Sequence, residues 1–169
     1  RQGFMAQLHK DLTRFQRYCA KRDLKPCVRL NGTSDIRWEI ILINGQSIFD
    51  QFPEIQFYDY SKIANRKVDH IANYDLTFSY SEANPAYAKQ VNIALERGLN
   101  IAVVFRDKDQ IPESFLGLPV VNGDKNDMRF QDPKQSIVAL YAKGKARKDT
   151  SGFVIDGLAL NASANRLAA

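Results

Sequence analysis

A short apolar run at residues 27–30 leads directly into a segment rich in hydrogen-bonding groups, Asn31-Gly32-Thr33-Ser34-Asp35. An Asn-Gly pair favours a turn with positive φ. Hydroxyls and backbone amides of this kind, placed at a helix N-terminus, bind phosphate or carboxylate groups. A structural alternative is that the same side chains cap a segment beginning at Trp38, with Glu39 placed for a capping box. The sequence leaves both interpretations open.

Reactive side chains also follow the other expected strands. Asp59 and Lys62 lie at the end of an aromatic strand, and Ser79 lies at the end of the next one. Lys62 has the chemistry of a phosphate contact or of an activated amine, although most lysines are simply solvated. Arg29 lies inside the first apolar run, and a buried arginine needs a carboxylate partner. Asp59 and Asp124 are the candidates for that partner.

The stretch NGDKNDMRFQD, 122–132, carries the carboxylates of Asp124, Asp127 and Asp132. Carboxylates at such spacing can hold a divalent cation, but the pattern is not that of an EF-hand loop. We favour a turn rich in Asp and Asn, with Asp127 and Arg129 paired at the surface, and expect no metal. The sequence contains no GxGxxG, P-loop, HExxH or GxSxG motif.

A basic stretch, 142–148, is the main sign of a nucleic-acid partner. It places four cations close together, Lys143, Lys145, Arg147 and Lys148. The chain as a whole has a formal net charge of +5, which permits contact with phosphates without requiring it. A solvated basic loop is the alternative interpretation.

The elements that would position these residues alternate between helical and strand patterns. Apolar residues from Phe4 to Cys19 recur at helical spacing, Asn84-Pro85 opens a second helix that Gly98 ends, and 65–74 has the pattern of a short polar helix. Strands are expected at 27–30, 55–60, 75–79, 100–105, 118–121 and 136–142. This order predicts an α/β fold, a mostly parallel sheet with crossover helices. We expect an incomplete (β/α)6-type barrel, with an open doubly wound sheet as the alternative. In either one, loops at the carboxyl ends of the strands gather into one ligand site.

Composition is that of a globular protein: 169 residues, 44% hydrophobic and 25% charged. We expect one α/β domain at 1–150 and a weakly packed C-terminal tail at 151–169. No apolar run approaches the length of a membrane-spanning helix. Two cysteines form no disulfide framework, which favours a reducing cytoplasm.

Five blocks of the sequence, RLNGTSDIRWE, FPEIQFYDYSK, YDLTFSYSE, LNIAVVFR and VVNGDKNDMRFQD…IVALYAKGKA, together resemble a family of proteins encoded by bacteriophages and plasmids. The resemblance covers about residues 1 to 155 and implies a fold similar to the radical-SAM-type partial barrel. In that fold a glycine-rich motif contacts the methionine part of S-adenosylmethionine, and Asn31–Asp35 stands in its place here without the two-glycine form. The chain has no CxxxCxxC motif, so the resemblance implies S-adenosylmethionine and an iron–sulfur cluster only if a cysteine-containing segment precedes this one. It supplies a fold and a genetic context rather than an activity, and this chain requires no cofactor by itself.

Two functions follow from these patterns. The first is a cleft at the strand ends that binds a nucleotide-like or otherwise phosphorylated ligand; the residues do not decide whether such a site is catalytic. The second is a non-catalytic module that binds nucleic acid or a host protein through the basic loop. The cleft would be lined by Arg29, Asn31, Gly32, Thr33, Ser34, Asp35, Asp59, Lys62, Ser79, Asp124, Asp127 and Arg129.

Overall fold

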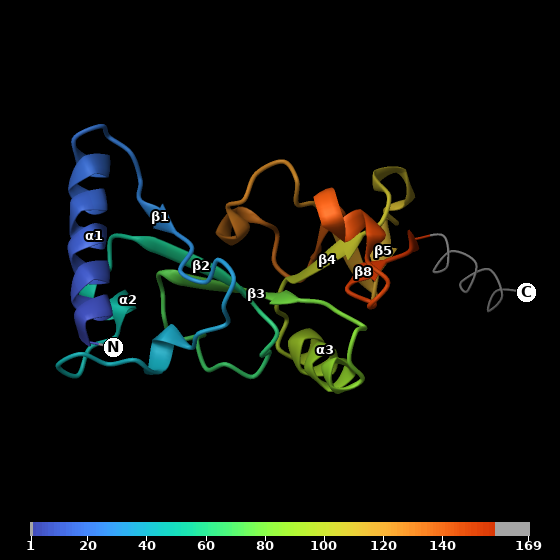
Figure 1. Ribbon diagram of the computed structural model, residues 1–169, viewed down its shortest axis with the longest axis horizontal. Helices are drawn as coiled ribbons and strands as arrows, with labels where there is room; N and C mark the ends of the chain where they lie inside the picture. Colours follow the sequence, from blue (N-terminus) through green and yellow to red (C-terminus); the bar gives the residue numbers. More distant parts are fainter. Residues whose placement is uncertain (1, 158–169) are drawn as a thin grey trace, which may run out of the picture. The chain divides into compact units, whose positions relative to one another are not determined.

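The computed structural model describes residues 2–157 and contains a mostly parallel eight-stranded sheet with few helices (Figure 1). The strand order is β1-β2-β3-β4-β7-β6-β5, and β8 pairs with β4 off this path. The strands are β1 (Cys27–Val28), β2 (Gln56–Ser61), β3 (Tyr74–Ser79), β4 (Ile101–Phe105), β5 (Ser114–Phe115), β6 (Leu118–Asn122), β7 (Ile137–Tyr141) and β8 (Val154–Ile155). The α-helices are α1 (Gln2–Ala20), α2 (Ile48–Gln51) and α3 (Ala86–Glu96), and the 3-10 helices are η1 (Trp38–Ile40), η2 (Lys108–Gln110), η3 (Arg129–Gln131) and η4 (Gly144–Lys148).

The chain divides into two compact units. Among the described residues, unit 1 comprises 2–59 and 66–75, and unit 2 comprises 60–65 and 76–157. β2 and β3 therefore each contribute residues to both units.

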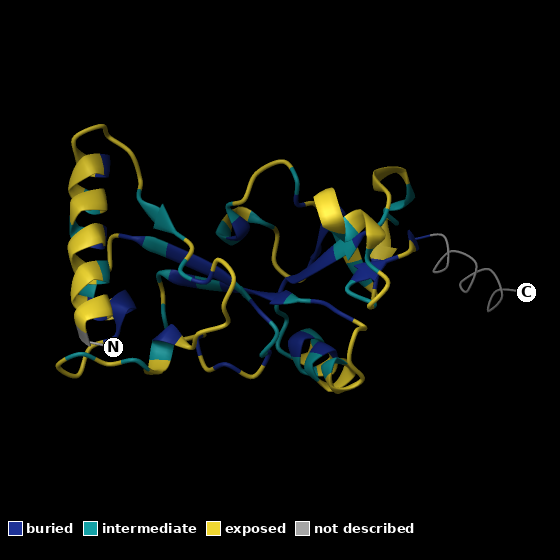
Figure 2. Cartoon of the chain, in the orientation of Figure 1, coloured by how far each residue is buried: buried dark blue, intermediate teal, exposed yellow. Residues whose placement is uncertain are grey.

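Unit 1 is built from α1, the β1–β2 pair and an aromatic core. The side of α1 that carries Met5, Leu12 and Cys19 is buried, as their seven-residue spacing requires, and most of the helix surface is exposed (Figure 2). Phe49 of α2 packs against both Phe57 and Tyr74, with ring centroids 5.1 and 4.4 Å apart. These aromatic pairs fix α2 and the two strands in one core.

Unit 2 has its core where α3 packs with the central strands. β4 is the most apolar strand, IAVVF, and four of its five residues are buried, as expected for a parallel strand covered on both faces. β4 pairs with β7 along its whole length, from Ile101↔Ile137 to Phe105↔Tyr141. The α3 helix buries Val91 and Ala94 in this core. Gly98, with φ +65°, ends the helix in the left-handed conformation that glycine adopts without strain.

All six predicted strands are present and the sheet is mostly parallel, but the predicted barrel is not confirmed. A barrel would keep its strands in chain order, whereas here β7 lies between β4 and β6. The link between the parallel strands β6 and β7 contains only η3, so it is not a crossover α-helix. The two-residue strands β5 and β8 had no sequence signal, and β8 lies within the segment expected to be a tail. The rest of that segment, from 158 onward, lies outside the described residues.

The helix expected at 65–74 is wrong, because this segment forms turns. Two of its polar residues contact the interior of unit 1. Arg66 is buried, and Asn73 donates to the carbonyl oxygens of Phe49, Phe52 and Ile55 at 3.0–3.3 Å. These three hydrogen bonds of Asn73 stabilise the turns more than the local helical pattern stabilises a helix. Among the described residues, no helix is long and apolar enough to span a membrane.

Candidate functional site

A buried carboxylate, Asp59 of β2, organises the polar part of unit 1. Asp59 is fully buried, and its Oδ1 accepts a hydrogen bond from the backbone amide of Asn31 at 2.7 Å. Its Oδ2 accepts from Asn31 Nδ2 at 3.3 Å and from the Tyr74 hydroxyl at 3.1 Å. Burial raises the pKa of Asp59 even though these donors favour the charged form. Burial likewise raises the pKa of Tyr74, which stays a neutral donor.

Asn31 ties the following loop to this carboxylate. Its Oδ1 accepts from Ser34 Oγ at 2.9 Å, from the Ile36 amide at 3.0 Å and from Trp38 Nε1 at 3.0 Å. Its Nδ2 also donates to the Ile36 carbonyl oxygen at 3.0 Å. Because β1 and β2 are parallel, Asn31 emerges at the same sheet edge as Asp59. One side chain therefore fixes the conformation of residues 31–38.

A buried arginine that sequence reasoning missed completes the network. The Arg66 side chain is fully buried; its Nε donates to Glu39 Oε1 at 3.1 Å and its Nη2 to Glu39 Oε2 at 2.6 Å. Arg66 also donates to Asp35 Oδ1 at 3.4 Å and to the Tyr74 hydroxyl at 3.0 Å. Burial alone would raise the pKa of Glu39, but the hydrogen bonds and charge of Arg66 outweigh it and hold that pKa below 4.5.

Several expectations for the 29–39 segment need correction. Arg29 is exposed and donates to the carbonyl oxygens of Asn31 and Gly32, both at 3.2 Å, so it needs no buried carboxylate partner. Gly32 does not have positive φ. No side chain caps η1; a capping box exists instead between Ser47 and Asp50. The exposed part of the loop includes residues Gly32–Asp35.

In unit 2, Lys62 and Ser79 lie together at the ends of β2 and β3. The Lys62 ammonium donates to the backbone oxygen and to Oγ of Ser79, both at 3.3 Å. Two aromatic rings flank it: the ammonium lies 5.3 Å from the ring centroid of Tyr87 and 5.0 Å from that of Phe153. Both rings are half-buried. The cation is thus held beside a hydroxyl and two π surfaces.

The 122–132 segment is organised around a second buried arginine, Arg129. Arg129 is 1% exposed and forms an ion pair with Asp132 at 3.4 Å, so the expected surface pairing with Asp127 is wrong. Its guanidinium also donates to the carbonyl oxygens of Gly123 and Asn126. Within residues 2–157, no group of three or more acidic, histidine or cysteine side chains is arranged to hold a metal ion.

The remaining carboxylates of this segment have other partners in unit 2. Asp124 accepts from Lys143 Nζ at 2.5 Å and from the Tyr141 amide at 3.0 Å, and Asp127 accepts from the Tyr60 hydroxyl at 3.3 Å. The Asp124 contact raises the pKa of Lys143.

The basic stretch forms an ordered 3-10 helix, η4, directly after β7. Arg106, at the end of β4, donates to the carbonyl oxygen of Arg147 at 3.0 Å and to that of Asp149 at 2.9 Å. These bonds attach the C-terminal part of η4 to the sheet edge. The cationic side chains themselves are exposed, Lys143, Lys145, Arg147 and Lys148.

The predicted site residues therefore fall into two sets. Arg29, Asn31–Asp35 and Asp59 belong to unit 1. Of these, Asn31, Ser34, Asp35 and Asp59 are joined directly or through Arg66 and Tyr74. Lys62, Ser79 and the 124–129 segment belong to unit 2. A single pocket that combines both sets stays a prediction.

Comparisons with known proteins give a family and no activity. No curated protein and no solved structure matches the chain, and none of these comparisons supports a likeness to radical-SAM proteins. The model of one family, described as Gene product 88, matches residues 1–157, almost the whole chain. The chain therefore belongs to the Gene product 88 family, a family of phage gene products.

Proposed function

We propose that the protein binds a phosphorylated, nucleotide-like ligand at the carboxyl ends of the strands in unit 2, with Lys62 as its principal cation. The observation that carries the proposal is the position of the Lys62 ammonium, next to the Ser79 hydroxyl and between the rings of Tyr87 and Phe153. Ligands of open α/β sheets bind beyond the carboxyl ends of the strands. Lys62 directly follows β2, and Ser79 is the last residue of β3.

The chemistry of this position suits a nucleotide better than a simple anion. The ammonium and the Ser79 hydroxyl can both donate to phosphate oxygens. A half-buried aromatic ring, of Tyr87 or of Phe153, offers a face on which a base can stack. A ligand phosphate would replace the carbonyl oxygen of Ser79, a weaker acceptor, as a partner of the ammonium.

Calorimetric titration with ATP, adenosine and inorganic phosphate tests this proposal. We expect ATP to bind more tightly than either fragment, and Lys62→Met to weaken ATP binding about 10- to 100-fold, because a charge-assisted hydrogen bond contributes about 1.5–3 kcal/mol. Lys62→Arg keeps the charge and should retain part of the affinity. Lys67→Met, an exposed lysine of unit 1, makes the same change in net charge and should leave binding unchanged.

Two results would contradict the proposal: no heat of binding with ATP, or equal affinities for Lys62→Met and Lys67→Met. S-adenosylmethionine belongs in the same series, because the family resemblance implies it. This ligand is a cation without a phosphate, so a site built around Lys62 should reject it. Tight binding that Lys62→Met does not affect would point to a different site.

A second candidate function is binding to the nucleic-acid backbone through η4. The specific observation in its favour is that Arg106 holds the backbone of η4 while the basic side chains of that helix remain exposed. An ordered array of cations loses less conformational entropy when it contacts phosphates than a flexible run does. Counterion release then makes the affinity fall steeply with salt.

The test is the salt dependence of binding to a labelled single-stranded DNA oligonucleotide. Lys145→Gln with Lys148→Gln should reduce the slope of log K against log [salt] by about 1.4, since each phosphate contact contributes about 0.7 on single strands. The matched control is Lys10→Gln with Lys21→Gln, which removes the same charge from exposed positions of unit 1. Equal slopes for the two double variants would count against η4 as the contact surface.

A further inference from the structure

Residues 1–25 carry the whole net charge of the chain. Residues 26–169 contain 17 basic and 17 acidic side chains, so the formal charge of +5 arises before residue 26. In the described part of that segment, six exposed cations are accompanied by only two carboxylates, those of Asp11 and Asp23. α1 and the turn that follows it therefore form a strongly cationic surface of unit 1. The six cations are Lys10, Arg14, Arg17, Lys21, Arg22 and Lys25.

Four of these cations form one stripe along α1, Lys10, Arg14, Arg17 and Lys21. Their spacings of four, three and four residues place them on the same side of a helix, over a length of about 16 Å. Lys21 follows the last residue of α1, and its amide still donates to the carbonyl oxygen of Arg17 at 3.2 Å. Within residues 2–157, none of the four side chains forms an ion pair or a hydrogen bond. All four charges are therefore available to a partner.

Exposed aromatic side chains lie along the next side of α1. Phe4, Phe15 and Tyr18 are separated by three helical turns and by one turn, so they project in the same general direction. Phe4 is 61% exposed, Phe15 is 36% exposed and Tyr18 is 50% exposed. The Phe4 ring stacks on Trp38, with the ring centroids 6.3 Å apart. A row of exposed rings is typical of a surface that contacts an apolar partner.

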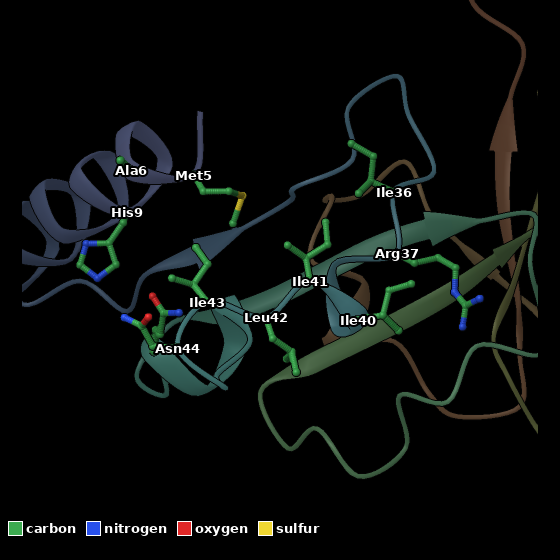
Figure 3. A pocket seen from close by; sticks show the side chains of 11 residues that line it. Met5, Ala6, His9, Ile36, Arg37, Ile40, Ile41, Leu42, Ile43 and Asn44 are labelled. Carbon is green, nitrogen blue, oxygen red and sulfur yellow. The ribbon is translucent and has the colours of Figure 1, made fainter. Parts of the chain in front are cut away.

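The cationic stripe points away from the interior of unit 1. Met5 and Cys19 are buried on the other side of the helix, and Figure 2 shows that most of the remaining helix surface is exposed. A groove lies beside α1, where Met5, Ala6 and His9 face the segment 36–44 (Figure 3). Neither the four cations of the stripe nor the three aromatic residues line this groove. These four cations and three rings together are called the outer face of α1.

We propose that the outer face of α1 binds the surface of an anionic phospholipid bilayer, with the helix lying parallel to the bilayer plane. Each lysine or arginine near such a surface is attracted by the anionic headgroups. Aromatic side chains are stable at the boundary between headgroups and acyl chains, as in other amphipathic helices that lie on membranes. Binding of this kind requires no membrane-spanning segment.

Charge complementarity and the exposed rings together select this partner. A nucleic-acid duplex would satisfy the cations, but its phosphate backbone offers no apolar surface to Phe4, Phe15 and Tyr18. A second copy of the chain would bring one cationic stripe toward another. Asp11, the one carboxylate of α1, lies one turn before Phe15 and should oppose binding to an anionic surface. Its removal therefore provides a test of opposite sign.

Co-sedimentation of the full chain with lipid vesicles measures this binding. We expect the chain to bind vesicles of equal parts phosphatidylglycerol and phosphatidylcholine at about 0.15 M salt. Vesicles of phosphatidylcholine alone have no net charge and should bind at least about tenfold more weakly. Arg14→Gln with Arg17→Gln should weaken binding to the anionic vesicles about 30-fold, because each cation near the surface contributes about a fivefold factor. The control, Lys89→Gln with Lys125→Gln, removes the same charge from exposed positions of unit 2 and should leave binding nearly unchanged.

Two further variants separate the bilayer from other anionic partners. Phe15→Ser with Tyr18→Ser should weaken vesicle binding at least about tenfold, because the lipid no longer covers two rings. The matched control is Leu42→Ser with Leu116→Ser, which removes aliphatic side chains that are 58% and 37% exposed and lie outside α1. Asp11→Asn should strengthen binding about fivefold. An unchanged circular dichroism spectrum establishes that each variant is folded.

Four outcomes overturn the proposal. One is the absence of binding to the anionic vesicles at millimolar lipid, and another is equal binding to vesicles of phosphatidylcholine alone. A third is an equal loss of binding in the two charge variants. The last is unchanged vesicle binding in the Phe15/Tyr18 variant, together with binding to duplex DNA that the Arg14/Arg17 variant abolishes, which would assign the stripe to nucleic acid.

Discussion

Replacing Asn31 by alanine should lower the stability of unit 1 by more than the loss of one exposed hydrogen bond of this loop would. The Asn31 side chain makes five hydrogen bonds, and two of them reach buried groups, Trp38 Nε1 and Asp59 Oδ2. Water can replace Asn31 at Ser34 and Ile36, which are exposed. Water cannot readily replace the Asn31 side chain at the two buried groups.

The expected loss follows from those two groups. An unsatisfied buried donor costs about 1–3 kcal/mol, and a hydrogen bond to a charged acceptor contributes about 1.5–3 kcal/mol. Asp59 Oδ2 keeps its bond from Tyr74, which reduces the second contribution. We therefore expect Asn31→Ala to lower the free energy of unfolding by about 3 kcal/mol. Ser34→Ala, which removes one exposed hydrogen bond to Asn31, should lower it by about 0.5 kcal/mol.

Urea unfolding followed by tryptophan fluorescence measures this difference. Trp38 is the one tryptophan in the sequence and lies in unit 1, so its emission reports on this network. Native Asn31→Ala should also emit at shorter wavelength, because the buried Trp38 Nε1 loses its hydrogen-bond acceptor at a position that water cannot readily enter. Asn31→Asp would place a second carboxylate near Asp59, so that variant should regain stability relative to wild type as the pH falls. Equal losses for Asn31→Ala and Ser34→Ala would refute the reasoning.

Three other outcomes follow from the same structure. Glu39→Gln should lower the free energy of unfolding by about 3 kcal/mol at neutral pH. Because folding lowers the pKa of Glu39, the stabilisation by its carboxylate is present above pH 4.5 and is lost as the pH falls through the pKa of the folded state. The urea midpoints of the variant and the wild type should therefore converge in acid. Arg66→Met should lower the free energy of unfolding by about 3 kcal/mol, because buried Glu39 keeps only the exposed Arg37, 3.3 Å away, as a cationic partner. The double variant with Glu39→Gln should lose less than the sum of the two single variants in a double-mutant cycle. Gly123→Ala should lower the thermal midpoint and cost about 1–3 kcal/mol of stability, because the added Cβ would lie 2.5 Å from Val138 Cγ1. The control is Gly32→Ala, whose Cβ would have nothing within 4 Å and should leave the thermal midpoint nearly unchanged in the same circular dichroism melt.

The strands were predictable because long apolar or aromatic runs have few other structures open to them. β4 and β7 are examples, and their bounds in the structure differ from the predicted ones by at most one residue at each end. The strands β5 and β8 were not predictable, because two residues give no periodicity to detect. The order of the strands in the sheet could not be predicted either, because the sequence shows that β7 is apolar but not which strands lie beside it.

The candidate site was predicted in part. Asn31 and Asp59 were both predicted to contribute to it, and they do contact each other. Arg66 and Arg129 were misjudged because arginine is usually exposed, so composition argues against burying it. For Arg129 a signal existed in the i,i+3 spacing to Asp132, its ion-pair partner. For Arg66 no local signal existed, since Glu39 and Asp35 lie 27 and 31 residues earlier in the chain.

β8 determines where the chain can be shortened. Val154 and Ile155 pair with Val104 and Phe105, and the Arg106 amide donates to the Ile155 oxygen at 2.8 Å. A truncation after residue 150, the expected end of the domain, would leave this edge of β4 without its hydrogen-bonded neighbour. Unpaired strand edges template association with other chains. Expression of a chain that stops before β8 should therefore yield aggregates, and a soluble form should include residue 155.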